Sequence, residues 1–270
     1  MGQPPTHLGS IVNMPPSGYA ILIGAGPTSG AGIARVLAKP AQGNMAVACL
    51  ARNEKNLKDL CQALQDTSGG GVVHPFPCDT TPANLSRTFV EISKHPDFRD
   101  LKLKVAIFHV KHALKKPYLE TSPDEFERNV ASYTTGAFAF AQEALKLMYE
   151  QNGGQTSLSE NPAKKGTIIF TGTLGAMRTN AEFNAYGAGR SAVRMIAQGL
   201  GKEHSKNGVH VVHTIANGGI QDVSKEDDEN VRIGKKMSAE SVGKTYLWLS
   251  QMEPDLWIDE LDLRPAQEKW

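Results

Sequence analysis

The sequence predicts a single doubly wound α/β domain, in which a mostly parallel sheet carries helices on both faces. Short apolar runs alternate with longer amphipathic segments along nearly all of the 270 residues, which is the order of β-α-β units. Several runs are apolar throughout, as strands covered on both faces of a parallel sheet are. The length suits one large domain or two small ones, and the unbroken alternation favours one.

Seven short runs are expected to form the strands of this sheet. In chain order they are YAILIG (19–24), MAVACLA (45–51), VVHPF (72–76), KVAIFHV (104–110), GTIIFTG (166–172), VHVVHTI (209–215) and WIDELDL (257–263). The amphipathic segments between them are expected to be helical, at 28–39, 53–66, 81–94, 123–150, 183–205 and 239–251. The final run completes a seven-stranded sheet.

Three stretches break this alternation. Residues 1–18 contain four prolines and little periodicity, so we expect a flexible lead-in to a domain at 19–270. Residues 151–165 are polar and are expected to form a surface loop. Residues 217–238 are rich in charge and follow a strand end, where ligands bind in such sheets. We therefore expect a substrate lid at 217–238, with a solvated loop as an equal alternative.

Composition excludes several classes of function. Lysine and arginine total 29 against 28 for aspartate and glutamate, so no global basic field favours nucleic acid or an anionic membrane. No apolar run approaches the ~18 residues of a membrane helix, and the first 18 residues lack the features of a secretory signal. Cys49, Cys61 and Cys78 have no metal-ligand spacing and cannot all pair. We expect a cytoplasmic, reduced protein without a metal site.

The strongest local motif is GAGPTSGAGIARVLA, which begins at Gly24, follows an apolar run and opens a helix. Gly26, Gly30 and Gly32 would allow a tight turn and the approach of backbone N–H groups to a pyrophosphate, beside the positive end of the helix. Thr28 and Ser29 lie in the same loop, and Ser29 could add a hydroxyl contact. We expect a nucleotide site here, against the alternative of a packing turn.

Residues after the second and third strands indicate which nucleotide. Arg52 stands where an acidic residue would bond the adenosine ribose of NAD, and an arginine suits a 2′-phosphate instead. Arg52 therefore favours NADP(H), with a solvated arginine at a helix start as the alternative. Asp79 could bond the adenine amino group or cap the helix that begins near Thr81, and these two roles are compatible. Asn53 and Thr80 complete the expected cofactor contacts.

At this point the chain resembles the short-chain dehydrogenase/reductase family, over residues 19 to about 263. The resemblance depends on the glycine loop, Arg52, Asp79, Tyr186 before a long helix, and the run Asn217-Gly218-Gly219-Ile220. The ending ELDLRP and the final tryptophan are similar to an atypical subgroup of that family. The resemblance implies a Rossmann-type fold, a nicotinamide cofactor, which Arg52 specifies as NADP(H), and a small-molecule substrate. It also implies that Gly218 and the backbone of Ile220 flank the nicotinamide.

The family's catalytic set is a Tyr-x-x-x-Lys pair, a serine thirteen residues before the tyrosine, and an asparagine on the preceding helix. By position, Tyr186 matches the tyrosine and is expected to donate the proton, and Thr173 replaces the serine as partner of the substrate oxygen. Arg190 replaces the lysine and is expected to support the ribose and the charge of the site. Tyr133 replaces the asparagine, either as an acid or as a core tyrosine. His109 follows the fourth strand, either as a proton shuttle or as a bystander whose backbone contacts the cofactor.

Three functions stay open at this stage. The first is an NADPH-dependent reductase for a carbonyl, imine or enone on a small, fairly apolar molecule, in secondary metabolism. The second is a non-redox isomerase or cyclase on the same scaffold, suggested by the altered catalytic set. The third is an NADP(H) sensor without catalysis. In this family the helix at 183–205 packs against a partner subunit, so a homodimer or homotetramer is expected, against a wholly intrachain role.

Overall fold

Seven parallel strands form the central sheet of the computed structural model, which describes residues 15–223 and 226–269. Their order across the sheet is β3-β2-β1-β4-β5-β6-β9. Their bounds are β1 Tyr19–Ile23, β2 Ala46–Ala51, β3 Val73–Pro77, β4 Leu103–Phe108, β5 Gly166–Gly172, β6 Val209–Ala216 and β9 Glu260–Leu263. The predicted fold class is thus confirmed, whereas most of the expected lead-in, residues 1–14, lies outside the described residues.

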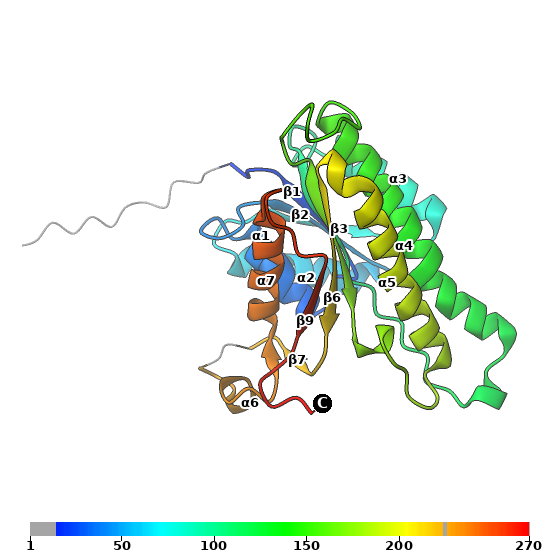
Figure 1. Ribbon diagram of the computed structural model, residues 1–270. Coiled ribbons are helices and arrows are strands. Elements are labelled where there is room, and N and C mark those ends of the chain that lie inside the picture. Colours follow the sequence, from blue (N-terminus) through cyan, green and yellow to red (C-terminus); the bar gives the residue numbers. More distant parts are fainter. Residues whose placement is uncertain (1–14, 224–225, 270) are drawn as a thin grey trace, which may run out of the picture.

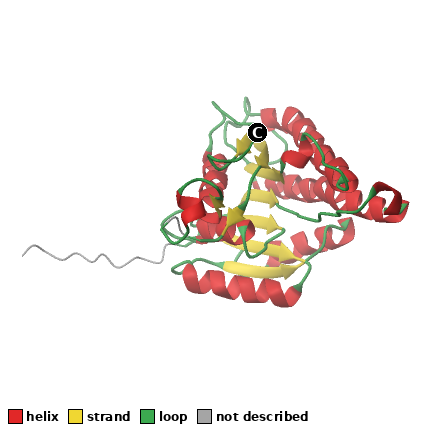
Figure 2. Ribbon diagram, turned by 90° about the horizontal axis from the view of Figure 1, so that it is seen from below, coloured by secondary structure: helices red, strands yellow, loops and turns green. Residues whose placement is uncertain are grey.

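Helices cover both faces of the sheet, as Figures 1 and 2 show. The long helices are α1 Ser29–Ala38, α2 Glu54–Thr67, α3 Pro82–Lys94, α4 Pro123–Gln151, α5 Asn184–His204 and α7 Ala239–Gln251. Three-residue 3-10 helices occupy Tyr118–Glu120, Leu174–Ala176 and Ser205–Asn207. None of the helices in the described ranges is long and apolar enough to cross a membrane.

The two helical layers enclose two hydrophobic cores, one on each face of the sheet. Along β1, Tyr19, Ile21 and Ile23 join the core under α3, α4 and α5. Ala20 and Leu22 join the core under α1, α2 and α7. All five residues of β1 are buried, which explains why this strand is apolar at every position rather than alternating.

The strand order places a ligand crevice at a definite point. β1 lies between β2 and β4, so the chain winds outward in both directions from this strand. In doubly wound sheets the crevice opens beyond the carboxyl ends of the strands at this reversal. The glycine loop follows β1 directly and therefore lies at that crevice.

The segment at 217–238 contains regular structure that the sequence did not indicate. It includes β7 Ile220–Gln221, the short helix α6 Glu229–Arg232 and β8 Met237–Ser238, and β7 pairs with β8 in a small second sheet. Arg35 of α1 donates two hydrogen bonds, of 2.8 and 2.7 Å, to the Asp222 carboxylate. The amide of Gln267 donates to the carbonyl of Gly234. This part of the chain is tied to α1 and to the C-terminal tail, and its closure as a lid stays a prediction.

Candidate functional site

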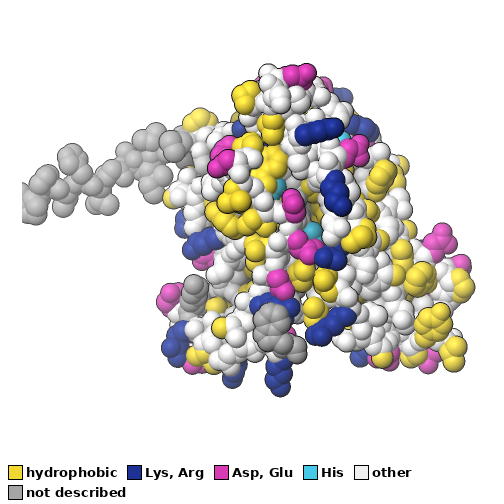
Figure 3. Space-filling model, in the orientation of Figure 1, with side chains coloured by type: hydrophobic (Ala, Val, Ile, Leu, Met, Phe, Trp, Pro, Cys, Tyr) yellow, Lys and Arg dark blue, Asp and Glu magenta, His cyan; other side chains and the backbone are white. Residues whose placement is uncertain are grey.

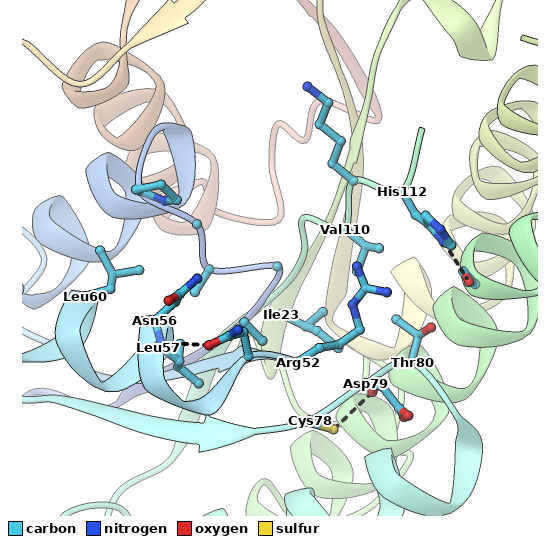
Figure 4. Close-up of a pocket in the computed structure, with 18 of the residues that line it drawn as sticks. Ile23, Arg52, Asn56, Leu57, Leu60, Cys78, Asp79, Thr80, Val110 and His112 are labelled. Carbon is cyan, nitrogen blue, oxygen red and sulfur yellow. Dashed lines mark hydrogen bonds between the residues drawn. The ribbon is translucent and has the colours of Figure 1, made fainter. Parts of the chain in front are cut away.

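A cavity of about 630 Å³ opens at the carboxyl ends of β1 to β4 (Figure 4). Its walls come from the glycine loop, the β2–α2 connection with the first turns of α2, the segment after β3, the segment after β4 and one residue of α4. Five expected cofactor residues line it together: Gly26, Arg52, Asn53, Asp79 and Thr80. The structure therefore gathers at one cavity residues that are up to about 50 positions apart in the chain.

The glycines of the loop serve different purposes. Gly24 has a φ of +90°, and a Cβ there would lie 2.3 Å from the His109 carbonyl oxygen. A Cβ on Gly32 would lie 2.4 Å from the backbone of Ala239, so this glycine allows α1 to pack against α7 and does not line the cavity. A Cβ on Gly26 would meet only the Gly24 carbonyl, at 3.9 Å. Packing does not require a glycine at position 26, and its missing side chain leaves room in the cavity.

The start of α1 suits an anion. The side chain of Thr28, the N-cap, makes no capping hydrogen bond, and the first turn of α1 contains no acidic residue. The opening N–H groups of a helix and its dipole favour negative charge at this end. Together with the open space at Gly26, this end of α1 fits a phosphate group of a dinucleotide.

The segment after β3 and the start of α2 combine helix capping with cavity lining. The Asn53 side chain accepts a 2.9 Å hydrogen bond from the Asn56 amide and so caps α2. Asp79 accepts hydrogen bonds from the Thr81 amide and hydroxyl and from the Asn84 side chain. Burial opposes the charge of Asp79, but these hydrogen bonds and nearby Arg52 lower its pKa below the ordinary value. Asp79 therefore orders the turn before α3, whose N-cap is Thr81, and its carboxylate stays at the cavity, while its contact with the adenine stays a prediction.

Arg52 is an exposed cation at the edge of this cavity. Figure 4 shows its side chain near Thr80 and Asp79. Lys111, His112 and Ser132 also line the cavity, and none of them belongs to a binding motif. Lys111 and His112 follow β4, and Ser132 lies on α4. No motif marks these three residues, so sequence reasoning had no signal with which to find them.

Thr173 and Tyr186, the expected substrate partner and proton donor, lie in contact with each other. Thr173 follows β5, Tyr186 lies in the first turn of α5, and their hydroxyl oxygens are 2.8 Å apart. Arg190 lies one turn further along α5. Neither hydroxyl lines the 630 Å³ cavity, nor do Gly218 and Ile220 at the end of β6. The cavity and the hydroxyl pair both lie at the carboxyl edge of the sheet, on neighbouring strands.

Arg190 is held inside the protein, with only 2% of its surface exposed. Its guanidinium donates to the carbonyl oxygens of Thr171 at 2.6 Å and Val110 at 2.9 Å. It also lies 4.7 Å from the ring centre of Tyr133 and 5.2 Å from that of Tyr186. A cation over an aromatic face is attracted by the ring quadrupole. The geometry favours electrostatic support of Tyr186, and contact of Arg190 with a ribose stays a prediction.

Tyr133 has the environment of a core tyrosine. Its ring is fully buried, and its hydroxyl accepts a 2.6 Å hydrogen bond from the backbone amide of His112. The Asn129 side chain donates to the carbonyl of His112. Burial raises the pKa of Tyr133, although the charge of Arg190 acts in the opposite direction. Of the two roles open for Tyr133, the geometry favours the structural one, which anchors the segment after β4.

His109 joins the glycine loop to the centre of the sheet. Its Nε2 lies 2.7 Å from the Ser29 hydroxyl, and its Nδ1 lies 2.8 Å from the Thr171 hydroxyl. The Thr171 hydroxyl also lies 2.7 Å from the Tyr246 hydroxyl, which in turn lies 2.6 Å from the Thr214 hydroxyl. Burial, with a smaller effect of the Arg190 charge, lowers the pKa of His109 to about 4. A neutral ring bonded on both nitrogens is suited to holding Ser29 and poorly suited to shuttling protons near neutral pH.

Gly218 and Ile220 occupy the end of β6 and the small second sheet. Gly218 has a φ of +127°, and a Cβ there would lie 2.6 Å from Pro265. The amide of Asn217 donates to the Leu263 carbonyl, and Ile220 pairs with Met237. These contacts explain the turn within the protein itself, and the expected contacts with a nicotinamide stay a prediction.

A family model and a curated relative each match most of the chain. A family model described as enoyl-(acyl carrier protein) reductase matches residues 26–254. An uncharacterized oxidoreductase of Staphylococcus aureus strain USA300 is 24% identical over 247 residues, which cover 92% of this chain and 96% of the relative.

Solved structures with the same fold include a short-chain dehydrogenase from Rhodopseudomonas palustris. It has a TM-score of 0.73 and 23% identity, with 93% of this chain and 100% of the other covered. An alcohol dehydrogenase from the archaeon Thermococcus sibiricus, complexed with 5-hydroxy-NADP, has a TM-score of 0.72 and 17% identity. That alignment covers 93% of this chain and 98% of the other.

Proposed function

The chain belongs to the short-chain dehydrogenase/reductase family, and we propose that it is an NADPH-dependent reductase of a small, fairly apolar molecule. The functional group that it reduces is a carbonyl, an imine or an enone. The observation that carries the proposal is the 2.8 Å contact between the hydroxyls of Thr173 and Tyr186 beside the buried cation of Arg190. This arrangement offers a proton donor, a hydroxyl partner and a fixed positive charge at one place.

In the proposed mechanism, NADPH supplies the hydride when it is bound, and the protein supplies the proton. Tyr186 donates its phenolic proton to the substrate atom that gains negative charge. Thr173 holds the Tyr186 hydroxyl in position and offers a second hydrogen bond to the same substrate atom. Arg190 stabilises negative charge that develops on the Tyr186 oxygen, because its charge stays permanent and lies 5.2 Å from the ring centre.

The choice of NADPH over NADH depends on the charge of the cavity near β2. Arg52 and Lys111 are the cations in the lining, and the position directly after β2 carries Arg52 rather than an acidic residue. A guanidinium can bind a phosphate through two parallel hydrogen bonds. The related alcohol dehydrogenase of Thermococcus sibiricus was solved with an NADP derivative, which supports the same choice.

Two finer expectations belong to this proposal. Phe183 lies with its ring centre 6.0 Å from that of Tyr186, and Met177 is half exposed and nearby in the sequence, which supports an apolar substrate. A role in secondary metabolism is part of the proposal and has no separate structural support. Phe138 on α4 and Met195 on α5 are 54% and 53% exposed. The expected homodimer or homotetramer would place such apolar side chains of α4 and α5 in an interface between subunits.

The proposal can be tested with NADPH deuterated at the transferable C4 position. The protein is incubated with this cofactor and a small-molecule extract of its host, and the products are analysed by mass spectrometry. A product with one added deuterium is expected from the wild type and from Tyr118→Phe, which changes an exposed tyrosine that does not line the cavity. Tyr186→Phe should abolish that product while NADPH binding persists.

Two outcomes would contradict the reductase. Retention of the deuterated product by Tyr186→Phe would remove this residue from the chemistry. A new product of unchanged mass and without deuterium would favour the isomerase or cyclase.

A further inference from the structure

A cluster of metal-ligating side chains lies at the edge of the sheet, away from the cavity. His74 lies near the start of β3, the edge strand, and His95 caps the carboxyl end of α3. Asp97 follows two residues later. The cavity residues Cys78 and Asp79 lie beyond the opposite end of β3, roughly 15 Å along the strand at the usual rise per residue. The cluster is therefore separate from the proposed catalytic site.

The three side chains converge on one point. One potential ligand atom from each lies within 4.8 Å of the corresponding atoms of the other two. His74 Nε2 is 2.5 Å from an oxygen of Asp97, and the centres of the two imidazole rings are 4.4 Å apart. Ligand atoms about 2.1 Å from a tetrahedral zinc ion are about 3.4 Å from one another. Small rotations of these partly exposed side chains suffice to reach that spacing.

The backbone that carries the cluster is well anchored. Phe98, next to Asp97, is buried in the core, and its ring packs against the rings of Tyr19, Phe76 and both histidines. The turn after α3 is also closed by the Phe98 amide, which donates to the His95 carbonyl. A site on a rigid backbone loses less conformational entropy on binding than one on a mobile loop.

The backbone around His95 allows a metal ion at either ring nitrogen. The Asp97 amide donates to His95 Nδ1 over a long 3.3 Å contact. A metal ion at Nδ1 replaces that contact, and one at Nε2 moves the ring proton to Nδ1 and breaks it.

We propose that His74, His95 and Asp97 form a binding site for a divalent zinc ion. Two imidazoles and one carboxylate are ligands that zinc prefers, and water completes a four-coordinate site on the open side. The ion lies between His74 and Asp97 and replaces their direct hydrogen bond. Because the ligands come from β3 and from the turn after α3, bound zinc ties the edge strand to the α3–β4 connection.

The test is a titration of the full chain with zinc chloride by isothermal calorimetry, together with thermal unfolding. His95→Phe removes one ligand but keeps an aromatic ring against Phe76 and Phe98, and Asp97→Asn removes the charge at nearly constant shape. Asp100→Asn is the matched control, because Asp100 is an exposed carboxylate three residues away that contacts Arg99. Far-UV circular dichroism and unfolding without zinc show that each variant is folded.

The wild type and Asp100→Asn should bind one equivalent of zinc at this site and unfold at a higher temperature with zinc present. His95→Phe and Asp97→Asn should each abolish zinc binding at this site or weaken it by more than about 10–100-fold. That range is the effect of removing a residue that only hydrogen-bonds to a metal ligand. Zinc affinity in both variants within threefold of the wild type overturns the proposal. So does the absence of zinc binding by the wild type. Neither result depends on reductase activity.

Discussion

Tyr133→Phe separates the two roles that the sequence left open for this residue. The change removes one oxygen and keeps the ring in its fully buried place beside Arg190. The lost oxygen accepts a 2.6 Å hydrogen bond from the His112 amide, while Asn129 still holds the carbonyl of the same residue. A partly buried amide left without its acceptor costs about 1–2 kcal/mol. For a chain of this length that corresponds to a fall in Tm of roughly 2–8 °C.

The consequences for function follow from where His112 lies. His112 and Lys111 line the cavity, so a looser segment after β4 should weaken NADPH binding by a few-fold and leave turnover nearly unchanged. A residue that donates a proton in the reaction would instead contribute about 10²–10⁴-fold to the rate. The assays are urea or thermal unfolding, fluorescence titration with NADPH and turnover on the substrate found by deuterium transfer, with Tyr118→Phe as control. Unchanged stability with a hundredfold loss of turnover would refute the structural role.

Three further predictions concern the cavity and its support. Because the pKa of His109 is depressed in the folded protein, this residue takes up a proton at a higher pH in the unfolded chain than in the folded one. The contribution of His109 to stability is therefore complete above about pH 6.5 and is lost as the pH falls towards 4. The stability difference between the wild type and His109→Gln should therefore shrink by on the order of 3 kcal/mol over that range in urea unfolding, and a difference that does not change with pH would contradict the value. In fluorescence titrations, Arg52→Ala should weaken the binding of NADPH about 10–100-fold and the binding of NADH only slightly. Lys58→Ala, which removes an exposed cation on α2, should change the binding of neither cofactor. Equal losses of affinity for both cofactors would argue against a contact with the 2′-phosphate. Gly26→Ala should weaken NADPH binding at nearly constant Tm, whereas Gly32→Ala should lower the free energy of unfolding by about 1–3 kcal/mol, and the reverse pattern would show that the two glycines are wrongly assigned.

Buried strands and the glycine loop were predictable because their signals are local. The run YAILIG is apolar at every position because both faces of β1 are covered, and that pattern is visible without any knowledge of the neighbours. The 3-10 turn after Thr173 and the first turn of α5 bring Thr173 to Tyr186, and the resemblance to the family's catalytic set marked both positions. The small β7–β8 sheet was missed, because two-residue strands carry no periodicity to detect.

Arg190 shows the limit of reasoning by position. Its place one turn after Tyr186 is set by the helical repeat, and its charge was certain from its identity. The direction of its guanidinium could not be predicted, because it depends on carbonyl groups near the ends of β4 and β5 and on the ring of Tyr133. An arginine aimed at the protein's own backbone supports the site differently from a lysine aimed at a ribose.

By itself, the sequence determined the fold class, the order of the strands and helices, the glycine loop at the first strand end and the identity of the hydroxyl pair. The first three depend on periodicity or on short spacing along the chain, whereas the hydroxyl pair was identified from the resemblance to the family's catalytic set. Only the tertiary structure decided which side chains meet across elements. Ser29, His109, Thr171 and Tyr246 form one hydrogen-bonded chain from four distant segments, and His74 meets His95 and Asp97 at the sheet edge. Such contacts arise from the packing of strands and helices, and no local pattern records which distant residue will be the partner.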